Sequence, residues 1–234
     1  MATINNYTLG IVLNEMDFGE SSKIIRVFTK EYGKISIMVK GAMSPRSKNL
    51  SVSQVFGVNE YLLKKGQSFF YISDSKILES NFKIRENYDN LIYASILLEI
   101  LDKSSISGET NKKAFDLLRK TLKFFNFTKD PISLALAFEL KYLSFIGYRP
   151  RLEIKEKSYF SLREGIIDFQ DPFSFSLTRK DLVYLNEILY GKLEDLKNIE
   201  NIEISRKKYL HNIIIKYIKY NLDISSFKSD KLFN

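Results

Sequence analysis

The stretch YGKISIMVK, residues 32–40, carries the clearest structural signal in the chain. Apolar residues from Ile35 to Val39 alternate with a second set that begins at Lys34 and ends at Lys40. A period of two residues is that of a β-strand with one buried and one exposed face. The stretch therefore predicts a strand with an apolar face toward a core and a basic, polar face toward solvent.

Other short strands are expected on both sides of this one. Period-two or β-rich runs lie at 7–13, 24–28, 56–63 and 69–73, and a polar loop with Pro45 lies at 41–49. Five strands in about 75 residues suit a small closed barrel such as an OB-fold. An SH3-like barrel would give a similar pattern, so the residues alone leave both barrels open.

Beyond residue 80 the apolar period lengthens toward the 3.6 residues of an α-helix. Helices are predicted at 85–101, 110–127, 131–147, 182–190 and 206–220. Asp130-Pro131 is a helix start signal, and Gly147 is a plausible stop. Residues 148–176 predict a small β-ribbon between helices. The predicted fold class is α+β: an N-terminal five-stranded barrel domain at 1–80, then a mostly helical domain at 81–234 that includes the ribbon.

Composition excludes several kinds of site. There are no cysteines and one histidine, His211, so thiol catalysis, thiolate metal sites and multi-histidine metal sites are excluded. An oxygen-ligand Mg²⁺ or Ca²⁺ site stays possible. No phosphate-binding glycine loop, dinucleotide fingerprint or nucleophile elbow is present, which predicts that the protein is not an enzyme and has no small-molecule substrate. No apolar run spans a bilayer and no secretory signal is present, so we expect a soluble intracellular protein.

Charge is concentrated near the N-terminus. The chain has 36 Lys+Arg against 28 Asp+Glu, a net +8, but most of the basic residues are lysine, and such a total can reflect genome composition. Within 23–48, however, seven basic residues accompany one acid, Glu31, which is 7 − 1 = +6. Several cations on one surface are what phosphate binding needs. The predicted DNA-binding residues are Lys23, Arg26, Lys34, Lys40, Arg46 and Lys48, with Phe18 and Tyr32, and with Phe28 and Tyr61 nearby, as surfaces for base stacking. The alternative is a solvated sheet face.

Two further helices are basic, at 112–123 and 206–219. Their candidate partner-binding residues, suited to an acidic peptide, are Lys112, Lys113, Arg119, Lys120, Arg206 and Lys207. The second of these helices has an apolar face, which a membrane-surface helix and a helix packed on a core both show; packing on a core is favoured, and no membrane partner is expected. His211, between apolar neighbours, is expected to be a partly buried histidine with a satisfied partner.

Several motifs, in order along the chain, resemble a known family. They are GIVL at 10–13, DFGES at 17–21, TKEYGK at 29–34 with KGA at 40–42 and RSK at 46–48, FELK through GYRP at 138–150, and ISSFKSDKLF at 224–233. In these motifs the chain resembles the bacterial recombination-mediator family RecO.

The resemblance implies an N-terminal OB-fold joined to a helical domain, and a non-enzymatic role in DNA repair and recombination. It implies binding of single- and double-stranded DNA and annealing of complementary strands coated by single-strand-binding protein. It also implies partnership with RecR in loading RecA, and contact with the C-terminal tail of single-strand-binding protein. The expected location is the cytoplasm, in association with the nucleoid. An adaptor recruited to single-strand-binding protein, with weak DNA affinity of its own, is the alternative function.

One departure from the family concerns zinc. Many members carry a four-cysteine zinc module after the GYRP segment, whereas residues 151–165 here contain no cysteine. We therefore expect no bound zinc and no other cofactor. Tyr159, Phe160 and Ile167 are the residues expected to preserve the ribbon.

Overall fold

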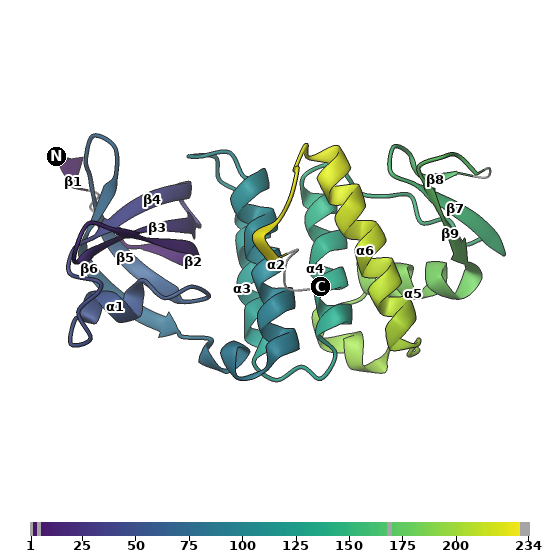
Figure 1. The fold of residues 1–234 in the computed structure, drawn as a ribbon, viewed down its shortest axis with the longest axis horizontal. Helices are drawn as coiled ribbons and strands as arrows, with labels where there is room; N and C mark the ends of the chain where they lie inside the picture. Colours follow the sequence, from purple (N-terminus) through teal and green to yellow (C-terminus); the bar gives the residue numbers. More distant parts are fainter. Residues whose placement is uncertain (1, 4–5, 168–169, 230–234) are drawn as a thin grey trace. The chain divides into compact units, whose positions relative to one another are not determined.

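The structure, a computed structural model, describes residues 2–3, 6–167 and 170–229 (Figure 1). By its internal contacts the chain divides into two compact units, Met1–Phe127 and Thr128–Asn234. This division groups the first two long helices with the N-terminal strands, whereas the boundary expected at residue 80 assigns them to the helical domain. The domain boundary at residue 80 stays a prediction.

The first unit is built on a closed barrel of five strands. These are β2 (Thr8–Phe18), β3 (Ser22–Thr29), β4 (Gly33–Val39), β5 (Val58–Lys65) and β6 (Phe70–Glu79). Neighbours pair in the order β5-β2-β3-β4-β6, and an additional β5–β6 pairing closes the barrel. The β4–β6 pair is parallel and the other pairs of the barrel are antiparallel. A two-residue strand, β1 (Ala2–Thr3), extends the sheet beside β5. The predicted OB-like barrel is confirmed.

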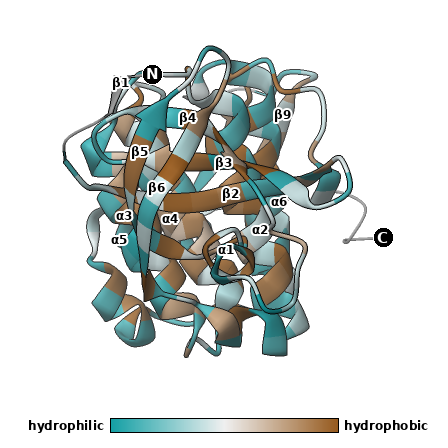
Figure 2. Ribbon diagram, turned by 90° about the vertical axis from the view of Figure 1, so that its left-hand side faces the viewer, coloured by the Kyte–Doolittle hydropathy of each residue, from teal (hydrophilic) through white to brown (hydrophobic). Residues whose placement is uncertain are grey.

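Strand β4 buries every second residue, as its sequence predicts, with Ile37 fully buried. In Figure 2, β2 and β3 carry long hydrophobic stretches, whereas β6 mixes hydrophobic and hydrophilic residues. Burying a branched aliphatic side chain contributes about 1.5–3 kcal/mol, so this alternation supplies much of the barrel's stability. Tyr61 and Phe28 are also buried here, so they offer no stacking surface to nucleic acid, contrary to expectation. The hydroxyl of Tyr61 donates to the backbone carbonyl of Val52 at 2.9 Å.

Between β4 and β5 lies a short helix, α1 (Lys48–Val52). The loop predicted for 41–49 therefore ends earlier, because the Ser47 side chain caps the helix by accepting the Asn49 N–H at 3.1 Å.

Two helices complete the first unit: α2 (Tyr88–Ser104) and α3 (Lys112–Phe125), preceded by a 3₁₀ turn, Phe82–Glu86. The connection between them passes close to strand β4. The N–H of Gly108 donates to the carbonyl of Lys34 at 3.2 Å, and Gly33, with φ +63°, leaves no room for a side chain beside the backbone of Glu109. Gly33 is therefore required twice, for its conformation and for this close approach.

The second unit contains α4 (Pro131–Phe145), α5 (Arg179–Tyr190), a 3₁₀ segment Leu193–Asn198, and α6 (Ile204–Asn221). Helix α4 begins as predicted: the Asp130 side chain accepts the Ser133 N–H at 3.2 Å, and Pro131 occupies the first turn. Helices α4 and α6 contact each other. There Nε2 of His211 lies 2.9 Å from Oε1 of Glu139, and both side chains are buried.

The predicted ribbon is a sheet of three strands, β7 (Lys157–Ser161), β8 (Gly165–Ile167) and β9 (Ser174–Thr178), in the order β8-β7-β9. The third strand was not expected. Phe160 is fully buried and meets the ring of Tyr217 on α6 edge-on, with centroids 5.3 Å apart. The side chain of Ile167 and residues 230–233 of the tail motif lie outside the described residues.

Candidate nucleic-acid interface

The cations on the outer face of β3 and β4 are engaged by the end of α2. Nη2 of Arg26 lies 2.6 Å from Oδ2 of Asp102, and Nζ of Lys34 lies 4.0 Å from Oδ1 of the same carboxylate. Lys34 also donates to the backbone carbonyl of Asp102. Its side chain is only 14% exposed, and burial lowers the pKa of its ammonium group. Arg26 and Lys34 therefore anchor the helix to the barrel. Lys34 is poorly placed to contact phosphates, whereas Arg26 keeps 41% of its side chain exposed beside Asp102.

Two other residues of the predicted binding set also make contacts within the first unit. Lys23 forms an ion pair with Glu15 at 3.0 Å, and its side chain is 12% exposed. Tyr32 is partly buried and packs against the barrel core, which leaves little of its ring for a base.

Three of the predicted cations are exposed: Lys40 and Arg46 in the connection between β4 and α1, and Lys48 at the first residue of α1. Asn49 donates from Nδ2 to the carbonyl of Lys40 at 2.8 Å, and the N–H of Met43 donates to the carbonyl of Ser21 at 3.2 Å. These bonds fold the connection against the β2–β3 turn. Within the described part of the chain, no carboxylate forms an ion pair with any of the three cations.

Aromatic rings lie at the same end of the barrel. Phe18, 48% exposed at the end of β2, has its ring centroid 6.5 Å from that of Phe69, in the turn between β5 and β6. Nζ of Lys40 lies 5.9 Å from the ring centroid of Tyr71 on β6. Sequence reasoning identified Phe18 but missed Phe69 and Tyr71, whose signal was the aromatic run after Gly66.

We call these six residues the loop-end surface: Phe18, Lys40, Arg46, Lys48, Phe69 and Tyr71. In OB-folds, oligonucleotides bind to the face of the second and third strands and to the turns after the first and fourth strands. Those turns correspond here to β2–β3 and β5–β6. The exposed carboxylates Asp17 and Glu20 also lie near the β2–β3 turn, so the positive charge is concentrated on the side formed by residues 40–48.

Lys48 also acts on a neighbouring carboxylate. The pKa of Asp74 is lowered, chiefly by the hydrogen bond from the Tyr7 hydroxyl and to a smaller extent by the charge of Lys48. A phosphate at Lys48 would therefore compete with a weak, solvent-screened attraction rather than with an ion pair.

The predicted partner-binding residues fall in both units. On α3, Lys112, Lys113 and Lys120 are exposed, whereas Arg119 donates from Nε and Nη2 to Oε1 of Glu79, at 2.8 and 2.6 Å. This two-pronged contact holds α3 to the end of β6.

On α6, both predicted cations form ion pairs within the second unit. Arg206 donates to the two carboxylate oxygens of Asp181 at 2.8 and 2.5 Å. Burial by itself raises the pKa of the Asp181 carboxyl, but hydrogen bonds from Arg206 and Thr178 outweigh burial and hold that pKa below its usual value. Lys207 is buried and pairs with Asp130.

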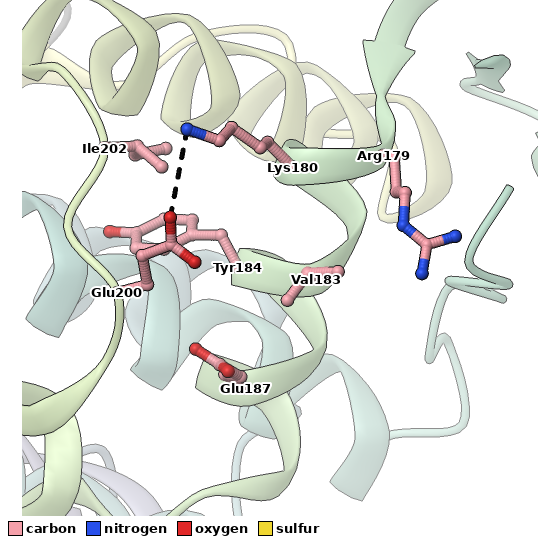
Figure 3. Close-up of a pocket in the computed structure, with 7 residues that line it drawn as sticks. All are labelled: Arg179, Lys180, Val183, Tyr184, Glu187, Glu200 and Ile202. Atoms are coloured by element: carbon pink, nitrogen blue, oxygen red, sulfur yellow. Dashed lines mark ion pairs between the residues drawn. The ribbon is translucent and has the colours of Figure 1, made fainter. Parts of the chain in front are cut away.

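A small pocket of about 210 Å³ opens beside α5 (Figure 3). Its charges are mixed, since Nζ of Lys180 lies 3.8 Å from Oε1 of Glu200 across its mouth. The residues that line it are Arg179, Lys180, Val183, Tyr184, Glu187, Glu200 and Ile202. This balance of charges suits neither a polyanion nor an apolar ligand.

The described residues offer neither a metal site nor a membrane-spanning helix. Among residues 2–3, 6–167 and 170–229, no three His, Cys, Asp or Glu side chains form a group that could hold a metal ion. Over the same ranges, no helix has the length and apolar character needed to cross a membrane.

The barrel with its exposed loop-end cations defines an OB-like protein that presents a basic, aromatic surface. Comparison with known sequences identifies the family of this protein. Residues 1–81 match the family model described as recombination protein O N terminal, and residues 85–231 match recombination protein O C terminal. A DNA repair protein RecO of Alkaliphilus metalliredigens is 31% identical, over 95% of this chain and 96% of its own length. One of Bacillus mycoides is 29% identical, over 89% of this chain and 88% of its own length. The chain therefore belongs to the RecO family of DNA repair proteins.

Proposed function

We propose that this protein binds single-stranded DNA through the loop-end surface and, as a repair and recombination mediator, anneals complementary strands. The observation that carries the proposal is the set of three exposed cations, Lys40, Arg46 and Lys48, which have no ion-pair partners among the described residues. They lie beside the exposed ring of Phe18 and the partly buried rings of Phe69 and Tyr71, at or next to the two turns that OB-folds use. Lysine and arginine at these positions would contact phosphates, and the rings would stack unpaired bases.

Annealing on such a surface needs no covalent chemistry. A basic protein bound to two strands screens their mutual repulsion, and base pairing then drives the duplex together. Because phosphate contacts carry no base information, sequence preference would be slight, and double-stranded DNA would bind through the same cations. The proposal therefore includes a non-enzymatic role.

The protein partners form the finer part of the proposal. A RecO-family protein is proposed to act with RecR in RecA loading and to contact the acidic tail of single-strand-binding protein. On this chain, Lys112, Lys113 and Lys120 of α3 are the exposed members of the predicted set, so they are the residues proposed to receive that tail. The cytoplasmic nucleoid is the proposed place of action.

We also propose that the ribbon needs no zinc. The sequence has no cysteine, so the residues present do not fit the four-cysteine module of other family members. Packing of Phe160 on Tyr217, and the hydrogen bond from Asn221 to the carbonyl of Leu162 at 2.9 Å, provide the support that a metal gives elsewhere.

The salt dependence of single-strand binding tests the loop-end surface. Each phosphate contact on a single strand contributes a slope of about −0.7 to log K against log salt, so three contacts give about −2.1, or about 18-fold between 50 and 200 mM salt. We expect the triple variant Lys40→Gln/Arg46→Gln/Lys48→Gln to lose this component of the slope, measured by fluorescence anisotropy with oligothymidylate. The matched control is Lys129→Gln/Lys192→Gln/Lys197→Gln, three exposed lysines of the second unit. Equal slopes for the triple variant and the wild-type protein would contradict the proposal.

A further inference from the structure

In the second unit, the sheet β7–β9 lies along helix α6 (Figure 1). Near the start of the helix, the hydroxyl of Tyr209 donates to the carbonyl of Ser176 at 3.2 Å. Near its end, Asn221 donates to the carbonyl of Leu162, and between these contacts Phe160 packs on Tyr217. The helix thus contacts the sheet near its start, near its end and between the two.

Cations and aromatic rings follow one another along this contact between the helix and the sheet. Cζ of Arg206 lies 4.3 Å from the ring centroid of Tyr209, and Nζ of Lys216 lies 4.9 Å from that of Phe175. Farther on, Cζ of Arg163 lies 5.6 Å from the ring centroid of Phe173. We call the following residues the ribbon row: Arg163, Phe173, Phe175, Arg206, Tyr209, Lys216 and Tyr220.

The last part of the ribbon row is the most exposed. Phe173 and Tyr220 are 51% and 49% exposed, and Nε of Arg163 donates to the hydroxyl of Tyr220 at 3.1 Å. The exposed Arg163 thus contacts the ring of Phe173 and the hydroxyl of Tyr220. Rings that present a face to solvent beside an arginine are the arrangement that stacks an unpaired base and contacts its phosphate.

The charge around the row favours a polyanion. Helix α6 contains no Asp or Glu, and its exposed stripe reads Lys208, Asn212, Lys216 and Tyr220 at intervals of four residues. On the sheet, the carboxylate of Asp171 is occupied by the N–H of Phe173 at 2.7 Å. Among the described residues, the exposed Glu164 follows Arg163 in the turn between β7 and β8, and the exposed Asp223 follows the end of α6. The stripe is polar rather than apolar, which does not suit insertion into a membrane surface.

We propose that the ribbon row is a second binding surface for single-stranded DNA, carried by a compact unit other than the barrel. Phe173 and Tyr220 stack bases, while Arg163 and Lys216 contact phosphates. A ribbon row and a loop-end surface that both bind DNA would let one chain hold two strands at once. The binding of two strands rests on the proposed function, whereas the binding of DNA by the ribbon row does not.

The experiment uses the full chain in the background of the loop-end triple variant, Lys40→Gln/Arg46→Gln/Lys48→Gln. We expect residual binding of oligothymidylate in that background, and we expect Phe173→Ala/Tyr220→Ala to reduce it by roughly 5- to 150-fold for each base no longer stacked. Tyr220→Phe keeps the ring and should retain binding, while Tyr190→Ala removes a tyrosine of α5 that is 69% exposed, more than Tyr220, and serves as the control. Far-ultraviolet circular dichroism checks that each variant is folded.

Cross-linking with a thiothymidine-substituted oligothymidylate gives a direct map on the wild-type chain, where peptides containing Phe173 and Tyr220 should be labelled. Unchanged residual binding in Phe173→Ala/Tyr220→Ala overturns the ribbon row, whatever the loop-end variant does. The ribbon row is also overturned if duplex DNA competes for this residual oligothymidylate binding as strongly as single-stranded DNA does at equal phosphate concentration. A duplex offers no unpaired base to stack. A loop-end triple variant that binds like wild type contradicts the proposed function alone.

Discussion

The buried contact between Glu139 and His211 gives the sharpest stability prediction. The Glu139 side chain is 0% exposed and that of His211 is 6% exposed, and Nε2 lies 2.9 Å from Oε1. The variant His211→Leu would leave the carboxylate in an apolar interior without this partner. Leaving one buried polar group without its partner costs about 1–3 kcal/mol of unfolding free energy, and we expect a loss of that size.

A double-mutant cycle separates the free energy lost with the Glu139–His211 contact from the effect of changing the size and shape of the side chain at position 211. The double variant Glu139→Leu/His211→Leu removes both polar groups and should recover most of the loss, because apolar replacement of a buried pair is often neutral or stabilising. Urea unfolding, with hydrogen exchange of the α4 and α6 amides, measures the effect in the second unit. Asn212→Ala, an exposed change on the same helix, should stay within about 0.5 kcal/mol of wild type. A coupling energy below about 0.5 kcal/mol would refute the reasoning.

Two further predictions concern a turn and a carboxylate. Gly33→Ala and Gly41→Ala both place a side chain at positive φ, at a cost of about 1–2 kcal/mol, but only at Gly33 would the new Cβ lie 2.1 Å from the backbone oxygen of Glu109. Urea unfolding should therefore show Gly33→Ala to be the more damaging by about 1–3 kcal/mol, and equal losses would contradict the close approach. Asp181→Asn should destabilise the protein at neutral pH, because the folded-state pKa of Asp181 is lowered and its contribution is present above the ordinary value of 3.8. As pH falls through the folded-state pKa, wild type loses the same contribution, so the difference between the two proteins in urea unfolding should shrink; a constant difference would contradict the linkage.

Local patterns predicted the elements well, because a strand or a cap depends on near neighbours. The alternation around Ile37 predicted β4, and Asp130-Pro131 predicted the start of α4. The short helix α1 and the third ribbon strand were missed because each is brief and lacks a full apolar period.

The residues that form the candidate site were harder to predict, because exposure depends on long-range packing. Lys34 reads as an outward cation on its strand, yet Asp102, 68 residues along the chain, covers it. Arg206 reads as a helix-surface cation, yet it meets Asp181. Phe69 joins Phe18 only because the barrel closes, and the period of a single strand does not contain that information.

The engagement of Arg26 and Lys34 by Asp102 has a consequence for dissection of the protein. A fragment that ends at residue 81 retains the strands but lacks Asp102, so both cations would face solvent unneutralised. Such a fragment would present more positive charge than the intact chain does at the same face, and it would overstate the affinity of the barrel for DNA. A faithful excised barrel would have to extend through Phe127, the end of the first unit.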